Sequence, residues 1–395
     1  MNKFINLFLI LFFAALIFGC EEDPSSVGED LLAGQDLTSI HTLDSQADNL
    51  EQSSSSYIDT LSLGLSDRTL IGKTEQLTAK GVIKFGFAIS SALKTQITNN
   101  ELTPVNAYVT LKPDYSIGAA NNAFGINVHK ITADWNFEKF KKENLEKIQY
   151  NSTPFSSNFF SNDDTLFTID LNKEIVFDWL RSGVDTTIKN YGALYIPTPE
   201  SNKVFGFPTL TSAASSSELP TVYLIVMDTS GELDTLSATP SYDAFGVTGS
   251  MPGDDENFMY VQGGIPVHST VKFDLSSLPK NAIIIEANLS FVEDPLQAVK
   301  GSTYDDSLLV SLIKREMEHA IDTSVSSILM VKSGDTFKAN ISALVQHWVE
   351  GKMNYGLKIR AFDDDKSVNK IALYSSKVED VTLKPRLQII YADIK

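Results

Sequence analysis

The sequence contains almost no cysteine, because Cys20 is the only one in 395 residues. A single thiol excludes an intramolecular disulfide and a zinc site built from several cysteines. The five histidines are scattered, and none stands in the His-Glu-x-x-His spacing of a zinc protease. No Gly-x-Ser-x-Gly segment marks a nucleophilic serine. These absences predict that the protein is not an enzyme, although pairs of carboxylates for glycosidic cleavage stay open, since their separation in space is not given by the sequence.

Basic residues are also in the minority. There are 32 lysines and arginines against 50 aspartates and glutamates, so the formal net charge is minus 18. A surface of this sign repels phosphate backbones and other anionic surfaces. The composition therefore argues against nucleic acid as a partner.

Long hydrophobic runs are absent apart from one at the start. Residues 4–18 are apolar except for Asn6, they follow the single cation Lys3, and they end at Gly19-Cys20. The run is short for a membrane-spanning helix and has the form of a signal peptide, which we place at residues 1–19.

The end of this signal peptide, Ile17-Phe18-Gly19-Cys20, resembles the lipobox of bacterial lipoproteins. The resemblance implies that Cys20 is the lipidation site and the mature N-terminus, anchored in a membrane by its acyl chains. The acidic run Glu21-Glu22-Asp23 resembles the surface-export signal of Bacteroidota lipoproteins, which implies an outer-membrane protein exposed at the cell surface. Residues 20–56 are acidic and then rich in serine, and we interpret them as a flexible tether.

A segment near the C-terminus has a degraded copy earlier in the chain, which indicates two homologous domains. The later copy contains, in order, Asp335-Thr336, Phe337, Trp348, Gly351, Asn354-Tyr355-Gly356 and Pro385. The earlier copy contains Asp164-Thr165, Phe167, Trp179, Gly183, Asn190-Tyr191-Gly192 and Pro220. The apolar spacing before each tryptophan predicts a short helix with the ring on its buried face. We expect Trp179, Trp348, Tyr191 and Tyr355 to belong to the structural core.

Short alternating segments separated by Gly, Pro, Asn and Ser predict strands throughout the rest of the chain. Examples are residues 81–87, 105–111 and 126–131, which have counterparts at 270–275, 285–291 and 308–314. The pattern predicts an all-β fold of two tandem jelly-roll-like β-sandwich domains, each with one short helix. We place the first domain at 57–228 and the second at 241–395, joined by a polar linker.

The second of these domains resembles a known family. Residues 271–275, Ala287-Asn288-Leu289, residues 345–348, Asn354-Tyr355-Gly356-Leu357 and Pro385-Arg386-Leu387 resemble the DNRLRE domain, a β-sandwich of bacterial and archaeal surface proteins. The resemblance is looser over residues 57–226. Some members of this family are treated as carbohydrate-binding modules, so the resemblance implies binding of polysaccharide.

Two sets of candidate binding residues follow. Sugar binding needs exposed aromatic faces next to groups that hydrogen-bond hydroxyls, and the candidates in predicted loops or strand ends are Trp135, Tyr115, Tyr260 and Tyr304. Two acidic loops offer hard oxygen ligands for a structural Ca²⁺, with Asp254, Asp255, Asp363 and Asp365 as the candidates. Solvated turns are the alternative for both loops, and no other cofactor is expected.

Two functions from different classes remain open. The first is non-catalytic binding of polysaccharide by a lipid-anchored cell-surface protein with tandem β-sandwich modules. The second is a structural or adhesive role, in which the sandwiches contact other cell-envelope proteins. A row of exposed aromatic rings would favour the first, and a broad apolar patch or an unpaired strand edge would favour the second.

Overall fold

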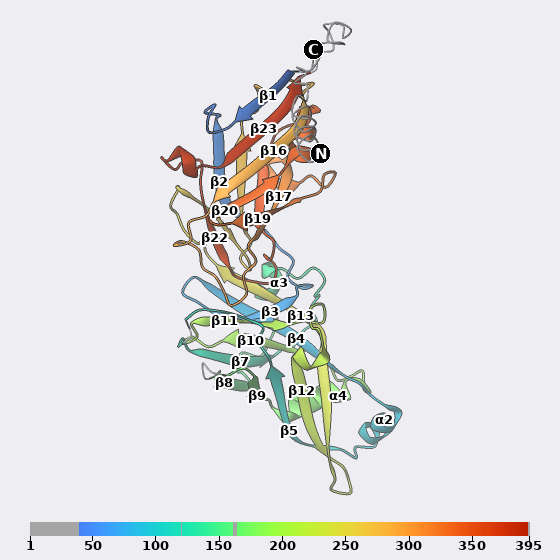
Figure 1. Ribbon diagram of the computed structural model, residues 1–395. Coiled ribbons are helices and arrows are strands. Elements are labelled where there is room, and N and C mark those ends of the chain that lie inside the picture. The colour runs from blue at the N-terminus through green and yellow to red at the C-terminus, as the bar shows by residue number, and fades with distance from the viewer. Residues whose placement is uncertain (1–38, 120, 161–163, 394–395) are drawn as a thin grey trace, which may run out of the picture.

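Two large curled antiparallel sheets make up most of the protein, and they lie end to end in an elongated molecule (Figure 1). The computed structural model describes residues 39–119, 121–160 and 164–393. The prediction of an all-β sandwich fold is confirmed. Among the described residues, no helix has the length and the apolar character needed to cross a membrane.

The N-terminal sheet has eleven strands and occupies the lower half of Figure 1. Its strands are β3 (Arg68–Lys73), β4 (Leu77–Phe87), β5 (Thr103–Leu111), β6 (Tyr115–Ile117), β7 (Phe124–Lys130), β8 (Ser156–Phe160), β9 (Phe167–Asp170), β10 (Ala193–Pro197), β11 (Lys203–Pro208), β12 (Thr221–Met227) and β13 (Leu233–Gly249). Its helices are α2 (Ser91–Thr98), α3 (Lys142–Glu146), α4 (Lys173–Arg181) and the 3₁₀ turn η2 (Ser216–Glu218).

The C-terminal sheet has twelve strands. They are β1 (Ser39–Asp44), β2 (Gln52–Ile58), β14 (Phe258–Gln262), β15 (Val267–Phe273), β16 (Ile283–Val292), β17 (Ser307–Arg315), β18 (Ala320–Ile321), β19 (Ile328–Ser333), β20 (Thr336–Asn340), β21 (Leu357–Ala361), β22 (Lys370–Tyr374) and β23 (Arg386–Asp393). Helix α5 (Ser342–Val349) and the 3₁₀ turns η3 (Glu316–Glu318) and η4 (Val381–Leu383) complete it.

Each sheet encloses a core built from alternate positions of its strands. In β16, Ala287, Leu289 and Phe291 are buried, while the residues between them face outward. In β5, Ala107, Val109 and Leu111 do the same. Each sheet also buries the tryptophan of its short helix, Trp179 of α4 and Trp348 of α5, so the helices close the cores.

The Asn-Tyr-Gly segments have the same local structure in both sheets. The Nδ2 amide of Asn190 donates to the Phe85 carbonyl at 2.8 Å, and that of Asn354 donates to the Phe273 carbonyl at 2.9 Å. Each Oδ1 accepts the N–H of the glycine two residues later. That glycine has a positive φ, 85° at Gly192 and 93° at Gly356, which favours glycine. The tyrosines between them, Tyr191 and Tyr355, are half-buried.

The interpretation of residues 20–56 as a tether is wrong for its second part. Strand β1 pairs with β23 and strand β2 pairs with β15, so residues 39–58 belong to the C-terminal sheet. Two serine hydroxyls of β2 have partners on β15, Ser55 with Thr270 and Ser56 with Ser269, each at 3.0 Å. The remaining residues of the expected tether, 20–38, lie outside the described residues, as do the signal peptide and Cys20.

The linker expected between residues 228 and 241 is also corrected. Residues 228–232 form the turn of a hairpin, and the chain returns as the 17-residue strand β13. This strand pairs with β12 and then with β4 along its length, so the N-terminal sheet extends to Gly249. The exposed polar residues Asp234, Thr235 and Ser237 of this segment belong to β13.

The two sheets meet through a shared apolar cluster. Leu70, Tyr115 and Phe245 come from the N-terminal sheet, and Tyr260 and Val368 come from the C-terminal sheet. A buried polar group lies beside it, where the two ring nitrogens of His268 are each 3.1 Å from a carboxylate oxygen, one of Asp59 and one of Asp364. Burial acts to raise the pKa of Asp59, but hydrogen bonds from His268 and Lys358 outweigh it and hold that pKa well below its usual range. The contact between the sheets is therefore part of the folded core.

Candidate functional site

The four aromatic residues proposed for sugar binding do not form one surface. Tyr115 is 1% exposed and Tyr260 is 5% exposed, so both are core residues between the sheets. The Tyr115 hydroxyl donates to Asn369 Oδ1 at 3.1 Å and accepts the Val368 N–H. Tyr304 is half-buried against the C-terminal core, and its hydroxyl donates to Glu293. The predictions for Tyr115 and Tyr260 are therefore corrected, because both rings are buried. Tyr304 lines a groove of about 410 Å³ together with Asp305, Asp306 and Lys366, and Trp135 lines a separate groove.

That groove lies on the outer face of the N-terminal sheet and has a volume of about 590 Å³. Its walls are the loop that follows β7 and the edge where β4 and β13 pair. It is lined by Lys84, Asp134, Trp135, Asn136, Phe137, Glu138 and Tyr242. We call this the Tyr242 groove.

The aromatic wall of the Tyr242 groove is a stacked pair. The rings of Phe137 and Tyr242 have centroids 4.4 Å apart and planes inclined by 21°. Tyr242 is 42% exposed, and the Lys84 ammonium lies 5.5 Å from its ring centroid. Neither ring of the pair belongs to a hydrophobic core cluster of the described residues.

The loop that carries Phe137 is fixed by buried neighbours. Phe140 and Leu145 pack on Val82 and Ala244, which face outward from β4 and β13. The Trp135 ring lies edge-on to Phe140, and its Nε1 donates to the Tyr191 carbonyl at 2.8 Å. Residues 137–149 thus cover the outer face of the sheet and contain the short helix α3. The Nε1 hydrogen bond and the contact with Phe140 fix the Trp135 ring in position, and the ring also lines the open groove.

Polar groups surround the aromatic wall. Asp134, Asn136 and Glu138 are exposed, and the Asn136 side chain accepts the Glu138 N–H at 2.9 Å, which fixes the turn. The carboxylates of Asp134 and Glu138 make no hydrogen bond or ion pair within the described part of the chain. A ring face beside free carboxylates and an amide is the combination that binds sugar hydroxyls.

The acidic loops proposed for calcium are placed differently. Asp254 and Asp255 lie in an exposed turn, where Asp255 accepts the Asn257 N–H. Asp363 is buried and accepts a hydrogen bond from Asn369 at 3.2 Å, and burial raises its pKa and that of Asp365. Across residues 39–393 as described, no three His, Cys, Asp or Glu side chains gather closely enough to hold a metal ion. Calcium binding stays a prediction without an assembled site.

Two further grooves lie beside the tryptophan helices. The groove next to Trp179 includes Lys84, Phe85 and Asn190, and the groove next to Trp348 includes Lys272, Phe273 and Asn354. Their volumes are about 350 Å³ and 770 Å³. Each contains the asparagine that holds the neighbouring strand, so we assign both to the shared architecture.

Sequence reasoning did not identify Lys84, Phe137 and Tyr242. Tyr242 was expected at the start of the second domain, and the alternation of β13 was hidden by a register shift between Pro240 and Tyr242. Phe137 is followed by a charged segment, and no regular spacing of aromatic residues marks it as part of a surface. Only the pairing of Tyr242 with Lys84 across β13 and β4 shows that these residues share one face.

Comparison of the chain with known protein families finds no match, and comparison with curated proteins finds no matching relative.

Proposed function

We propose that the protein is a non-catalytic, lipid-anchored cell-surface protein that binds polysaccharide, and that the Tyr242 groove is its binding site. The observation that carries the proposal is the stack of the half-buried Phe137 with the exposed Tyr242, beside the free carboxylates of Asp134 and Glu138. Such a wall packs against the apolar face of a sugar ring while the carboxylates accept hydrogen bonds from its hydroxyls. The acidic surface favours a neutral glycan.

The first test is affinity gel electrophoresis of the chain without residues 1–20. The gels contain hydroxyethyl cellulose, xylan, laminarin or amylopectin, and calcium or chelator is added in parallel. We expect one of these neutral polysaccharides to retard the protein and Tyr242→Ala to abolish the retardation. Tyr374→Ala is the matched control, because Tyr374 lies in the C-terminal sheet outside every core cluster of the described residues. Unchanged mobility of the unmodified protein in all four gels would reject the proposal.

The lipid anchor has a separate test. Cys20→Ala should remove incorporation of labelled palmitate and release the protein from the membrane fraction, because the resemblance at residues 17–20 assigns the acyl chains to this thiol. Protease treatment of intact cells then reports whether the anchored protein faces outward. Full labelling of the Cys20→Ala protein would reject the assignment.

A second function, adhesion to another protein, is favoured by one observation. Strand β1 pairs only with β23, so its other edge is unpaired among the described strands, and Ile40 on it is 69% exposed. An open edge of this kind accepts a strand from a partner. Recovery of a cell-envelope protein that is lost after Ile40→Lys, together with no retardation by any polysaccharide, would select this function.

A further inference from the structure

A second stacked aromatic pair lies on the outer face of the same sheet. Tyr108 of β5 and Tyr223 of β12 are direct register partners, with ring centroids 5.0 Å apart and planes inclined by 23°. Their strand neighbours Ala107, Val109 and Val222 point into the N-terminal core, so the two tyrosines point away from it. Neither ring belongs to a core cluster of the described residues.

Strand β13 connects this pair to the Tyr242 groove. Tyr242 is the register partner of Lys84, and Ser237 on the same strand is the partner of Tyr223. The register shift between Pro240 and Tyr242 keeps Tyr242, Thr239 and Ser237 on the outer face. At the usual strand rise, Tyr242 and Ser237 are separated by about 15 Å along β13. Strands β5, β12 and β13 lie side by side in the lower part of Figure 1.

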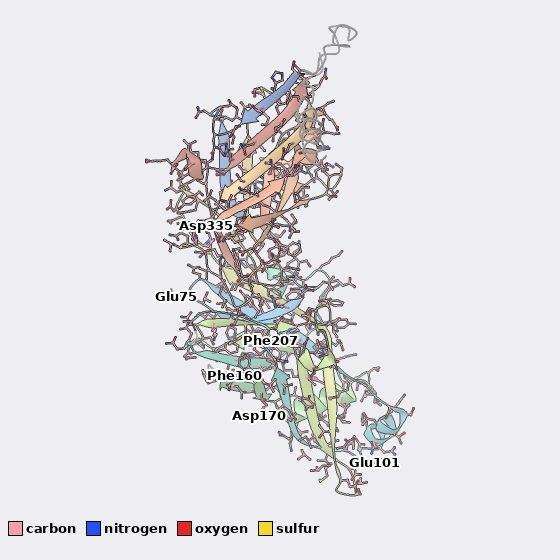
Figure 2. All side chains as sticks on the ribbon, viewed as in Figure 1. Glu75, Glu101, Phe160, Asp170, Phe207 and Asp335 are labelled. Carbon is pink, nitrogen blue, oxygen red and sulfur yellow. The ribbon has the colours of Figure 1, made fainter. Side chains whose placement is uncertain are left out.

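The residues on the outer face between the two aromatic pairs have small or polar side chains. Gly86 and Thr239 are register partners there, and Ser237 is exposed. The hydroxyls of Tyr108, Tyr223 and Ser237 make no hydrogen bond within the described residues. Beyond Tyr108, its register partner Asp170 adds an exposed carboxylate (Figure 2). No bulky side chain from the intervening strand positions interrupts the path between the pairs.

We infer that the Tyr108–Tyr223 pair is a second subsite for the same glycan, so that the protein binds an extended neutral polysaccharide along one track rather than a short oligosaccharide in one groove. The inference rests on the proposed function. Two ring faces on one rigid sheet contact two separated sugar units, and free hydroxyls contact the units between them. A chain that spans both subsites gains the second contact without a second loss of translational freedom.

The test compares a polymer with a fragment of it. The probe is whichever of the four polysaccharides retards the unmodified protein, together with its disaccharide, measured by affinity electrophoresis and calorimetry. We expect Tyr223→Ala and Tyr108→Ala to weaken polymer binding about five- to tenfold, as for loss of one aromatic contact. Binding of the disaccharide at the Tyr242 groove should not change. Tyr223→Phe, which keeps the ring, should retain most of the affinity.

A second variant tests the path itself. Ser237→Arg places a long side chain between the two pairs at an exposed position, removes no aromatic ring and disturbs no core contact. We expect it to weaken polymer binding and to leave disaccharide binding unchanged, with Tyr374→Ala as the unaffected control.

The outcomes separate the inference from the proposed function. If Tyr242→Ala abolishes polymer binding while Tyr223→Ala, Tyr108→Ala and Ser237→Arg all bind normally, the second subsite is rejected and the Tyr242 groove stands. If the unmodified protein binds none of the four polysaccharides, both are rejected.

Discussion

The two sheets share one local arrangement of residues, and they differ in the residues that surround this arrangement. In both, the asparagine amide of an Asn-Tyr-Gly segment donates to a carbonyl of a neighbouring strand, β4 or β15, and a short helix places a tryptophan in the core. In the N-terminal sheet, Ile89 lies against Gly183 and narrows the groove beside Trp179. In the C-terminal sheet, the space near Gly351 is open, and the groove beside Trp348 is about 770 Å³.

The outer faces differ more than the interiors. The N-terminal sheet presents two stacked aromatic pairs that no core cluster of the described residues includes. The C-terminal sheet has one such pair, Tyr57 with His319, whose ring centroids are 4.0 Å apart. It also takes up β1 and β2 from the start of the described chain, and its tyrosines Tyr391 and Tyr304 pack against its own core. The difference teaches that the repeated segments specify the scaffold, whereas the surface residues that distinguish the two sheets lie outside these segments.

The largest effect is expected from removing β1 and β2, the two strands from the start of the described chain that pair into the C-terminal sheet. A chain that starts at Asp59 loses both β1 and β2, and with them the bidentate contact of Asp44 with Arg386. We expect the C-terminal sheet to lose more than about 5 kcal/mol of stability, because whole strands exceed any single side chain. Calorimetry should show a separate low-temperature transition. A chain that starts at Ser39 is the control, and equal transitions for the two chains would contradict the prediction.

The tryptophans give the next largest effect. Trp179→Ala and Trp348→Ala should each cost about 3–5 kcal/mol in urea unfolding, as for other large aromatic side chains removed from cores. We expect Trp179→Ala to cost more, because Trp179 is flanked by Phe85 and Phe155, whereas Trp348 borders the larger groove, which water can enter. The corresponding changes to Phe should recover part of the loss. Equal costs would show that the open groove does not matter.

Substitutions of Asn190 and Asn354 test whether the Asn-Tyr-Gly arrangement stabilises both sheets. Asn190→Ala and Asn354→Ala should each cost about 1–3 kcal/mol, since each leaves a strand carbonyl and a glycine N–H without a partner. Asn106→Ala on the exposed face of β5 is the control and should change the free energy of unfolding very little. A loss at only one of the two sites would end the structural equivalence of the two segments.

The smallest effect concerns Asp243, a carboxyl inside the N-terminal sheet. Burial raises its pKa from 3.8 to about 6, against a hydrogen bond from Thr69 that lowers it. The folded protein therefore holds a proton that the unfolded chain releases, and stability falls as the pH rises from about 4 to about 6. Asp243→Asn should be about 1–2 kcal/mol more stable than the unmodified protein at pH 7.5 and equal to it near pH 4. Urea unfolding at both pH values measures this difference, and parallel pH profiles of the two proteins would contradict it.

Much of the fold could be predicted from local sequence. The alternation at residues 285–291 and the tryptophan spacing gave strands and helices, because a buried face imposes a period that remains in the sequence. The serine-rich segment 53–56 was not recognised as a strand, because its hydroxyls are paired across a seam that forms only after the whole chain has folded.

The candidate site was harder to predict for a related reason. A tyrosine in a short strand or at its end has the same sequence signature whether it faces water or another sheet. Tyr115 and Tyr260 are buried because the two sheets pack on each other, and that contact has no local period. Tyr242 and Tyr223 are brought onto one face by register across three strands, which composition and spacing along one strand do not encode.

The pairing of β1 with β23 also sets the mechanical layout of the molecule. The described chain enters at the end of the C-terminal sheet where β23 also finishes, and the N-terminal sheet lies at the opposite end (Figure 1). A pull along β1 from Ser39 loads its six register pairs together in shear, the direction in which a strand ladder resists most. Tension applied at Ser39 is therefore transmitted to β23, the last described strand, before it reaches the N-terminal sheet. The N-terminal sheet lies at the opposite end of the molecule from the point where the tension is applied (Figure 1).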